Sequence, residues 1–344
     1  MNDLASPPRG TARQNTVGVP TVIAGSAAML EVLALARRSA AGDAKVLVTG
    51  ESGVGKDVIA RHIHANSKRV RGPFVAVNCA GLTETLLESE LFGHVKGSFT
   101  GAYRDKRGKL QMAHGGTLFL DEVGEMSLRM QALLLRFLET GEIQSVGAHE
   151  ESSHVDVRVI SASNLPLADL VATGHFRSEL LELLAGTMIV LPPLRERAGD
   201  IPALTRHFLA RIGEQPGLRP LGITDSALQL LSAYDWPGNV RQLQAVLFRA
   251  AVFCDGNALT DEDFPQLCEM LGEMEAGGLA PDGVGVQLYT ADGNLRPLEE
   301  IEADVIRLAI GHYRGRMTEV ARRLGIGRST LYRKLSDLGI ESAA

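Results

Sequence analysis

A glycine-rich loop between an apolar strand and an amphipathic helix constrains the fold of this chain more than any other feature. The strand is expected at residues 46–49 and the helix follows residue 56, and the loop between them has the spacing G-x-x-x-x-G-K. The loop consists of Gly50, Glu51, Ser52, Gly53, Val54, Gly55, Lys56 and Asp57. Its glycines allow backbone N–H groups to surround a phosphate, while the helix N-terminus and the lysine add positive charge. A glycine-rich turn with a surface lysine is the alternative, but the flanking strand and helix favour the phosphate site.

A second apolar segment ends in two carboxylates. Residues 116–120 read Gly-Thr-Leu-Phe-Leu and are followed by Asp121 and Glu122. Asp121 is predicted to orient Mg²⁺, directly or through water, and Glu122 to act as general base for a water that attacks the γ-phosphate. An ordinary strand with a charged helix cap is the alternative if the carboxylates are taken alone. With the glycine-rich loop upstream, the two motifs predict hydrolysis of a nucleotide, ATP, with Mg²⁺.

Short apolar runs alternate with helical patterns in the first half of the chain, which predicts an α/β fold with a mainly parallel sheet. The predicted strands are residues 46–49, 74–77, 118–120, 155–162 and 188–191. Apolar residues then recur at helical spacing, and a region rich in glycine without any period follows. The expected division of the 344 residues is a disordered tail at 1–20, an α/β core at 21–197, a helical lid at 198–271, a flexible linker at 272–297 and a second helical domain at 298–344.

The composition excludes several classes of protein. No segment approaches the roughly 20 apolar residues that a membrane-spanning helix needs. Cys79, Cys254 and Cys268 are far apart, so neither a disulfide framework nor a zinc site is indicated. Residues 1–18 lack the apolar segment of a secretion signal, and we therefore expect a cytoplasmic protein.

A basic C-terminal segment contrasts with the acidic average of the chain. The formal net charge is −6, yet residues 312–335 hold seven Lys or Arg and one Glu, which gives +6. Residues 320–332 place two short helices around a glycine-containing turn, the pattern of a helix-turn-helix. The residues predicted to contact phosphates and major-groove base edges are Arg328, Ser329, Thr330, Tyr332, Arg333 and Lys334. A solvated basic helix is the alternative, and the charge cluster alone does not decide between the two.

Taken with their order along the chain, these motifs resemble the sigma-54-dependent transcriptional activators, or bacterial enhancer-binding proteins, of the AAA+ ATPase superfamily. Residues 88–94 (ESELFGH), 191–197 (LPPLRER) and 236–241 (WPGNVR) also match, and the resemblance covers nearly the whole chain after residue 20. It implies an AAA+ three-layer sandwich, a helical lid and a Fis-type helix-turn-helix domain that binds DNA as a dimer. Asp57 departs from the Ser or Thr usual in phosphate loops but fits the acidic residue of this family, and it joins Asp121 as a candidate Mg²⁺ ligand.

The most diagnostic stretch resembles the GAFTGA loop of that family. It consists of Gly97, Ser98, Phe99, Thr100, Gly101 and Ala102. A loop with glycine at each end and an exposed aromatic residue at its tip can insert an apolar ring into a partner. The resemblance implies that this loop contacts the sigma-54 subunit of RNA polymerase through Phe99 and Thr100. A hairpin tip with Phe99 packed inward is the alternative.

The resemblance also implies roles for four further residues. Asn164 matches the position that senses the γ-phosphate, Asn78 the residue that holds the catalytic glutamate, and Arg241 the second sensor in the lid. Arg177 matches an arginine finger that reaches the ATP of a neighbouring subunit. Without the family resemblance, simpler interpretations are available for three of them. Asn164 could cap a helix, Asn78 could form the turn after a strand, and Arg241 could form a surface ion pair.

One position departs from the family pattern in a way that bears on catalysis. Six residues after Arg177, where the family has a second arginine, this chain has Leu183. Leucine cannot donate hydrogen bonds to a phosphate. Three alternatives follow. Arg177 alone is sufficient for ATP hydrolysis, another arginine takes the place of the missing one, or turnover of ATP is impaired.

The resemblance implies a DNA-bound ATPase that forms a ring, expected to be hexameric, and remodels the closed complex of sigma-54 RNA polymerase. The alternative is a DNA-binding regulator that binds ATP but hydrolyses it poorly because of Leu183. An AAA+ replication initiator or remodeller is disfavoured by residues 97–102. Activators of this family, which include regulators of two-component systems, often carry a sensory domain before the ATPase, and here only about 20 polar residues precede it. We therefore expect no N-terminal regulatory domain. Control then comes from a partner protein in trans, from the expression level, or not at all, and a regulatory protein in trans is our hypothesis.

Overall fold

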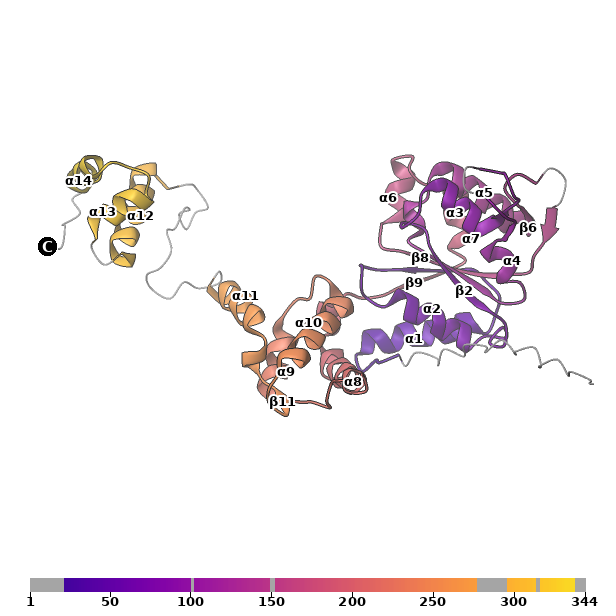
Figure 1. Ribbon diagram of the computed structural model, residues 1–344, viewed down its shortest axis with the longest axis horizontal. Coiled ribbons are helices and arrows are strands. Elements are labelled where there is room, and N and C mark those ends of the chain that lie inside the picture. Colours follow the sequence, from indigo (N-terminus) through magenta and orange to yellow (C-terminus); the bar gives the residue numbers. More distant parts are fainter. Residues whose placement is uncertain (1–21, 100–101, 149–151, 277–295, 314–315, 338–344) are drawn as a thin grey trace, which may run out of the picture. The chain divides into compact units, whose positions relative to one another are not determined.

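The computed structural model describes residues 22–99, 102–148, 152–276, 296–313 and 316–337 (Figure 1). The chain divides into two compact units, Met1–Leu267 and Cys268–Ala344. In the part of the chain described here, every helix is too short or too polar to cross a lipid bilayer.

A five-stranded parallel sheet forms the centre of the first unit. In spatial order its strands are β2 (Phe74–Asn78), β5 (Thr117–Asp121), β8 (Arg158–Ser163), β1 (Val46–Thr49) and β9 (Thr187–Val190). All neighbouring strands pair in parallel. The five predicted strands are therefore confirmed, and because they are parallel, all their carboxyl ends lie at one edge of the sheet.

Helices cover both faces of this sheet and make three layers. One face carries α1 (Ala27–Ala40) and α2 (Lys56–Ala65), and the other carries α3 (Glu84–Phe92), α5 (Leu128–Thr140) and α7 (Ser178–Leu184). Successive residues of β5 point to opposite layers: Leu118 and Leu120 pack with the second set of helices, and Phe119 with the first. This burial on both faces explains why the central strands β5, β8 and β1 read as apolar runs, whereas Met188 and Val190 of the edge strand β9 are exposed.

Short elements complete the α/β core. They are β3 (Gly93–His94), β4 (Lys106–Arg107), α4 (Lys109–Met112), the 3-10 helix Val123–Glu125, β6 (Glu142–Gln144), β7 (Ser152–His154), α6 (Leu167–Ala172) and the 3-10 segment Leu194–Asp200. The pairs β3–β4 and β6–β7 are antiparallel and lie outside the main sheet.

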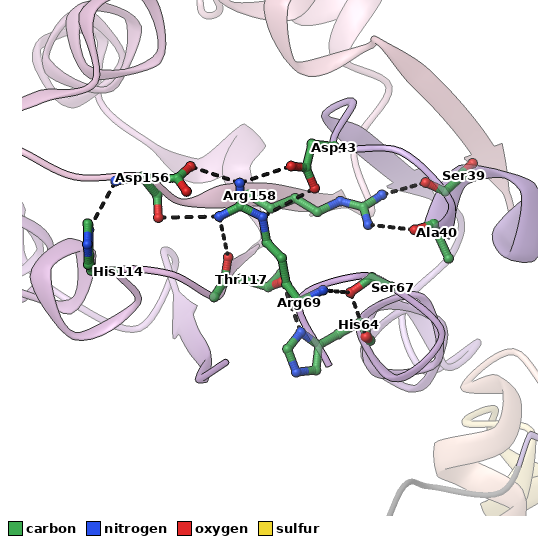
Figure 2. Close-up of polar contacts among 11 residues, drawn as sticks. Ser39, Ala40, Asp43, His64, Ser67, Arg69, His114, Thr117, Asp156 and Arg158 are labelled. Atoms are coloured by element: carbon green, nitrogen blue, oxygen red, sulfur yellow. Dashed lines mark hydrogen bonds and ion pairs between the residues drawn. The ribbon is translucent and has the colours of Figure 1, made fainter. Parts of the chain in front are cut away.

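A polar network, here called the amino-edge network, closes the edge of the sheet where the strands begin (Figure 2). Its members are Asp43, His64, Arg69, Thr117, Asp156 and Arg158, with the carbonyl groups of Ser39 and Ala40. Arg69 donates to the carboxylates of Asp43 and Asp156 at 3.0 and 2.8 Å, and these bonds raise the pKa of its guanidinium. Arg158, 2% exposed, donates to the Ser39 carbonyl at 2.6 Å and so ties β8 to the end of α1.

A helical lid follows the sheet in the first unit. It contains α8 (Ile201–Gly213), α9 (Asp225–Ala233), α10 (Asn239–Phe253), a 3-10 turn at Asp261–Asp263 and the short parallel pair β10 (Gly222–Ile223) and β11 (Ala258–Leu259). Helix α11 (Pro265–Ala276) begins in the first unit and continues into the second. The side chain of Trp236 is fully buried in its core and donates to the Leu231 carbonyl at 2.7 Å. Helix α11 continues past residue 271, into the segment predicted as a linker, and most of that segment lies outside the described residues.

After α11, the described residues of the second unit form three helices, α12 (Leu298–His312), α13 (Met317–Arg323) and α14 (Arg328–Asp337). Their shared core consists of Ile306, Ala309, Val320, Ala321, Leu331 and Leu335. Gly325, between α13 and α14, has φ = 69°, a left-handed conformation that glycine adopts without steric cost. This turn orients α13 and α14 as in a helix-turn-helix.

Candidate nucleotide-binding site

The glycine-rich loop connects β1 to α2 at the carboxyl edge of the sheet. Gly50, Gly53 and Gly55 all have positive φ, at 147°, 79° and 102°, so the loop backbone requires glycine at these positions. The Lys56 Nζ donates to the carbonyls of Gly50 and Glu51 at 2.7 and 2.9 Å. The ammonium group is thus held inside the curl of the loop, where a phosphate would bind.

Burial lowers the pKa of Lys56, although the carboxylates of Asp121 and Glu122 act in the opposite direction. Only 8% of Lys56 is exposed. A desolvated cation gains more from a bound anion than an exposed one, because little water competes for it. The site is therefore electrostatically prepared for a phosphate group.

Asp121 and Glu122 follow β5 at the same edge. The Asp121 Oδ1 accepts a hydrogen bond from the Glu122 N–H at 3.1 Å. Glu122 has φ = 58° and ψ = 45°, a left-handed conformation that costs a non-glycine residue roughly 1 to 3 kcal/mol. Burial, and then the charge of Glu122, raise the pKa of the Asp121 carboxyl. A cation beside these two carboxylates would relieve their mutual repulsion.

The lid is bound directly to the phosphate loop. The Gly53 carbonyl accepts from the Arg241 N–H at 3.3 Å, and the Arg241 Nη1 donates to the Ser52 hydroxyl at 2.9 Å. A Cβ at Gly53 would lie 2.5 Å from the Gly238 carbonyl oxygen, so glycine is also required for this close approach. Arg241, predicted as a sensor in the lid, therefore lies beside the loop.

Three further residues, for which the sequence motifs predict no role, bind the phosphate loop. Asn239 is fully buried and donates to Glu51 Oε2 at 3.0 Å and to the Ser52 carbonyl at 3.1 Å. Arg195 makes a two-point ion pair with the Glu51 carboxylate, and Arg197 donates to the Val54 carbonyl at 2.7 Å. All three lie in the stretches LPPLRER and WPGNVR, which match the family. Their position in these motifs was the one feature of the sequence that could have indicated a role at the site.

A cavity of about 920 Å³ joins these groups. Lys56, Asp57, Asp121, Glu122 and Arg241 all line it, together with the loop from Ser52 to Gly55. The apolar part of its wall includes Val22, Ile23, Leu204, Phe208 and Val240. Its volume suits a nucleotide, with polar groups at one end and an apolar wall for a flat base.

The remaining predicted catalytic residues lie outside this lining. Asn78 pairs with Asp121 across β2 and β5, but its side chain accepts from the Ala80 N–H at 2.8 Å, and no hydrogen bond joins it to Glu122 among the described residues. Asn164 is exposed just after β8. Arg177 is an exposed residue at the start of α7, and its Nε donates to the Leu128 carbonyl at 3.4 Å. Leu183 is half-buried on the same helix.

Comparison with known proteins identifies the family. The profile described as "Sigma-54 interaction domain" matches residues 22–190, "AAA+ ATPase lid domain" matches 195–275, and "Bacterial regulatory protein, Fis family" matches 297–338. The regulatory protein AtoC of Escherichia coli (strain K12) is 41% identical over 94% of this chain and 68% of its own length. This chain belongs to the sigma-54-dependent transcriptional activators.

Other members of the activator family agree with this assignment. The transcriptional regulatory protein ZraR of Klebsiella oxytoca is 46% identical over 86% of this chain and 63% of its own length. The chain thus spans about two thirds of the length of these relatives. The crystal structure of NtrX from Brucella abortus is 34% identical, with a TM-score of 0.66, and covers 92% of this chain and 69% of its own. NtrX has also been solved in complex with ATP, with a TM-score of 0.65, 34% identity and coverage of 93% of this chain and 70% of its own. The AAA+ fold is therefore a property of this activator.

The activator's GSFTGA loop is held at its base. The Gly97 N–H donates to the Ala102 carbonyl at 2.8 Å. Phe99 is half-buried, with its ring 5.0 Å from the ring of His94 in an edge-to-face contact, and is not the exposed tip expected from the sequence. Tyr103 is 86% exposed, while Thr100 and Gly101 lie outside the described residues.

The predicted DNA-contacting residues of the activator share α14. Arg328, Ser329, Tyr332 and Arg333 are exposed, and Leu331 and Leu335 point into the core, as their spacing predicts. The Lys334 Nζ lies 2.6 Å from the Glu302 carboxylate of α12, so this lysine is engaged within the unit. Thr330 is half-buried.

Proposed function

We propose that this activator hydrolyses ATP at the interfaces of a ring, expected to have six subunits, and uses the energy to remodel the closed complex of sigma-54 RNA polymerase. The observation that carries the proposal is the cavity in which Lys56, Asp121, Glu122 and Arg241 meet. The GSFTGA loop belongs to the same α/β core, so a change at the nucleotide can reach it through packed elements. The division into core, lid, linker and helix-turn-helix at residues 21–197, 198–271, 272–297 and 298–344 is part of the proposal.

The chemistry follows from the positions of the charged groups. Lys56 would leave the loop carbonyls for the β- and γ-phosphates, and Arg241 would add positive charge from the lid. Glu122 would accept the proton of the attacking water. Asp121, with Asp57 at the cavity wall, fits Mg²⁺, which keeps most of its ligands as water and phosphate oxygens and needs only one or two carboxylates. When bound, Mg²⁺ neutralises phosphate charge.

Arg177 would complete the site of a neighbouring subunit. It is exposed at the start of α7 and does not line the cavity of its own chain. A guanidinium supplied in trans stabilises the charge of the transferring phosphoryl group. Asn78 and Asn164 would act at the same edge of the sheet, as switch and γ-phosphate sensor.

The partners follow from the other two motifs. Residues 97–102 would contact sigma-54, with Phe99 released from His94 when the nucleotide state changes. The exposed residues of α14 would bind double-stranded DNA as part of a dimer. A regulatory protein acting in trans remains part of the proposal.

The test is steady-state ATP hydrolysis by the full chain across a range of protein concentrations, with open-complex formation on a sigma-54 promoter as the second readout. We expect turnover per subunit to rise with concentration as the ring forms, and polymerase activation to require hydrolysis. Glu122→Gln, which keeps the shape of the side chain, is the matched control and should bind ATP without turnover. Undetectable hydrolysis at concentrations where the ring is present would overturn the proposal.

The half-buried Leu183 supports a second candidate function, a DNA-binding regulator that binds ATP but hydrolyses it poorly. In that case Leu183→Arg raises turnover strongly. If the wild-type chain is already active and Leu183→Arg changes little, this second candidate is excluded.

A further inference from the structure

Three segments of the α/β core converge on the side chain of Gln131. This residue lies on α5 and is fully buried, with 0% exposure. Its Nε2 donates to the Met126 carbonyl at 2.8 Å and to the His175 carbonyl at 3.0 Å. Its Oε1 accepts from the Arg177 N–H at 2.9 Å. Both amide N–H groups and the amide oxygen are therefore used, and all three partners are backbone groups.

Two of these partners belong to the segment that presents Arg177. On its other side, this segment is held by the Leu170 carbonyl, which accepts from the His175 and Phe176 N–H groups at 2.8 and 3.0 Å. Phe176 is 3% exposed, whereas the Arg177 side chain is exposed. The backbone is thus fixed from both sides while the guanidinium remains at the surface.

The third partner ties this segment to the end of the turn after the two carboxylates. Met126 follows the 3-10 turn Val123–Glu125, which begins directly after Glu122. The Arg177 Nε also donates to the Leu128 carbonyl at the start of α5. Both the backbone and the side chain of Arg177 are therefore hydrogen-bonded to the N-terminal part of α5. A group that acts on a neighbouring subunit gains from this arrangement, because catalytic groups work only when held close to their productive position.

We propose that Gln131 is a positioning residue for Arg177: its buried amide fixes the backbone from which this arginine reaches the ATP of the neighbouring subunit. The inference rests on the proposed function, since Arg177 acts on ATP only across a subunit interface. The effect of losing Gln131 should consequently appear in the subunit that donates the arginine and not in the subunit that hydrolyses the ATP.

Mixed oligomers of the full chain test this directly. A donor chain carrying Glu122→Gln cannot hydrolyse its own ATP but retains Arg177, and a receiver chain carrying Arg177→Ala retains its own hydrolytic groups. Neither alone should turn over ATP, and mixing them should restore turnover at donor–receiver interfaces. Gln131→Met, of similar length but without hydrogen-bonding groups, is then added to the donor or to the receiver.

We expect Gln131→Met in the donor to lower the restored turnover by about tenfold to a hundredfold, since a shift of about 1 Å in a catalytic group can cost about a hundredfold. In the receiver it should change turnover by less than about twofold, as expected for a site that is not coupled to the change. Gln111→Met in the donor is the matched control, because the Gln111 amide also bonds to a backbone group, the Gly108 N–H, but in α4.

Equal losses in donor and receiver would overturn the inference and assign Gln131 a purely structural role, and no loss in either would overturn it too. If the mixture without any Gln131 change stays inactive, the proposed function itself fails at its trans-acting step. Thermal unfolding of each chain accompanies the assay. Where Gln131→Met is not folded at the assay temperature, Gln131→Glu takes its place, because it keeps an acceptor for the Arg177 N–H but loses the Nε2 donors, and the same donor-only loss is expected.

Discussion

The two edges of one parallel sheet carry polar clusters of different character. At the carboxyl edge, Lys56 and Asp121 line a cavity. The loop carbonyls of Gly50 and Glu51 hold Lys56, and the Glu122 N–H donates to Asp121. At the amino edge, Arg69 and Arg158 are enclosed by carboxylates and backbone carbonyls (Figure 2). Both clusters combine shielded cations with nearby carboxylates, but Lys56 of the first cluster lines a cavity, whereas Arg69 of the second is paired with two carboxylates.

This difference separates a binding site from a structural network. Burial lowers the pKa of Lys56 in the cavity, whereas the bonds to Asp43 and Asp156 raise the pKa of Arg69. Burial also lowers the pKa of Arg158, which donates to backbone carbonyls and not to a carboxylate, so the contrast is between Lys56 and Arg69. A group that the fold leaves poorly compensated gains from a ligand of opposite charge. A group that the fold already satisfies stabilises the fold instead. Removing the cation from each edge should therefore have opposite consequences.

The largest expected effect is on ATP turnover in Lys56→Met. Loss of a preorganised cation at the phosphates should lower turnover by at least about a hundredfold. The fold should tolerate this change, because burial disfavours the charged form of Lys56. Turnover is measured by phosphate release and folding by urea unfolding. Turnover within tenfold of wild type, or a collapse of stability, would contradict the distinction between the edges.

The next effect is on stability in Arg69→Met. This change removes the ion pairs to Asp43 and Asp156, whose side chains are 54% and 63% exposed. Because these carboxylates can be rehydrated, the expected loss is only about 2 kcal/mol in the free energy of unfolding. Urea denaturation measures the loss, and turnover per folded molecule should stay close to wild type. A variant of wild-type stability with reduced turnover would place catalytic function at the amino edge.

A smaller effect, of opposite sign, is expected for Asp121→Asn. Burial and the charge of Glu122 raise the pKa of Asp121, so the fold disfavours its ionised form at neutral pH. A raised carboxyl pKa contributes stability at acidic pH that is lost as pH rises through the folded-state value. Asp121→Asn should thus raise the melting temperature at pH 7 while lowering ATP turnover. The gain should shrink as pH falls towards the ordinary Asp pKa of about 3.9, and melting temperatures measured from pH 7 down to pH 4 are the control.

The smallest effect is the pH dependence contributed by His64 in the amino-edge network. Burial, and then the charges of Arg158 and Arg61, lower the pKa of His64 below its ordinary value of about 6.5. The unfolded chain therefore binds the proton first, and stability is lost as pH falls from about 6.5 towards the folded-state pKa. His64→Gln should flatten the fall in unfolding free energy between pH 7 and pH 5. His154→Gln, an exposed residue on β7, is the control, and an unchanged slope in His64→Gln would contradict the prediction.

The phosphate loop and the two carboxylates could be predicted because their chemistry is encoded over a few consecutive residues. Gly50 to Asp57 and Asp121–Glu122 each follow an apolar strand, and parallel strands necessarily bring their carboxyl ends to one edge. The helix-turn-helix could be predicted from the sequence for the same reason, because the spacing of Leu331 and Leu335 determines which face of α14 points into the core.

Contacts between distant segments could not be predicted in this way. Asn239 reaches the phosphate loop from the lid, and Arg195 reaches it from the 3-10 segment Leu194–Asp200. Gln131 joins α5 to the start of α7. Nothing in the local pattern around a glutamine or an asparagine indicates which backbone groups it will satisfy once buried. Phe99 is similar, because its contact with His94 depends on the packing of the loop and not on the loop's sequence.

The sequence by itself determined the kind of chemistry this activator can perform, because strand, glycine loop and carboxylate pair are local patterns whose backbone geometry follows from residue type. The tertiary structure alone decided which polar groups are left for a ligand and which are satisfied within the protein. Compensation of a buried charge depends on every group that packs around it, and those groups come from all parts of the chain. Lys56 and Arg69 are both basic residues beside carboxylates, and only their surroundings make one a binding group and the other a structural one.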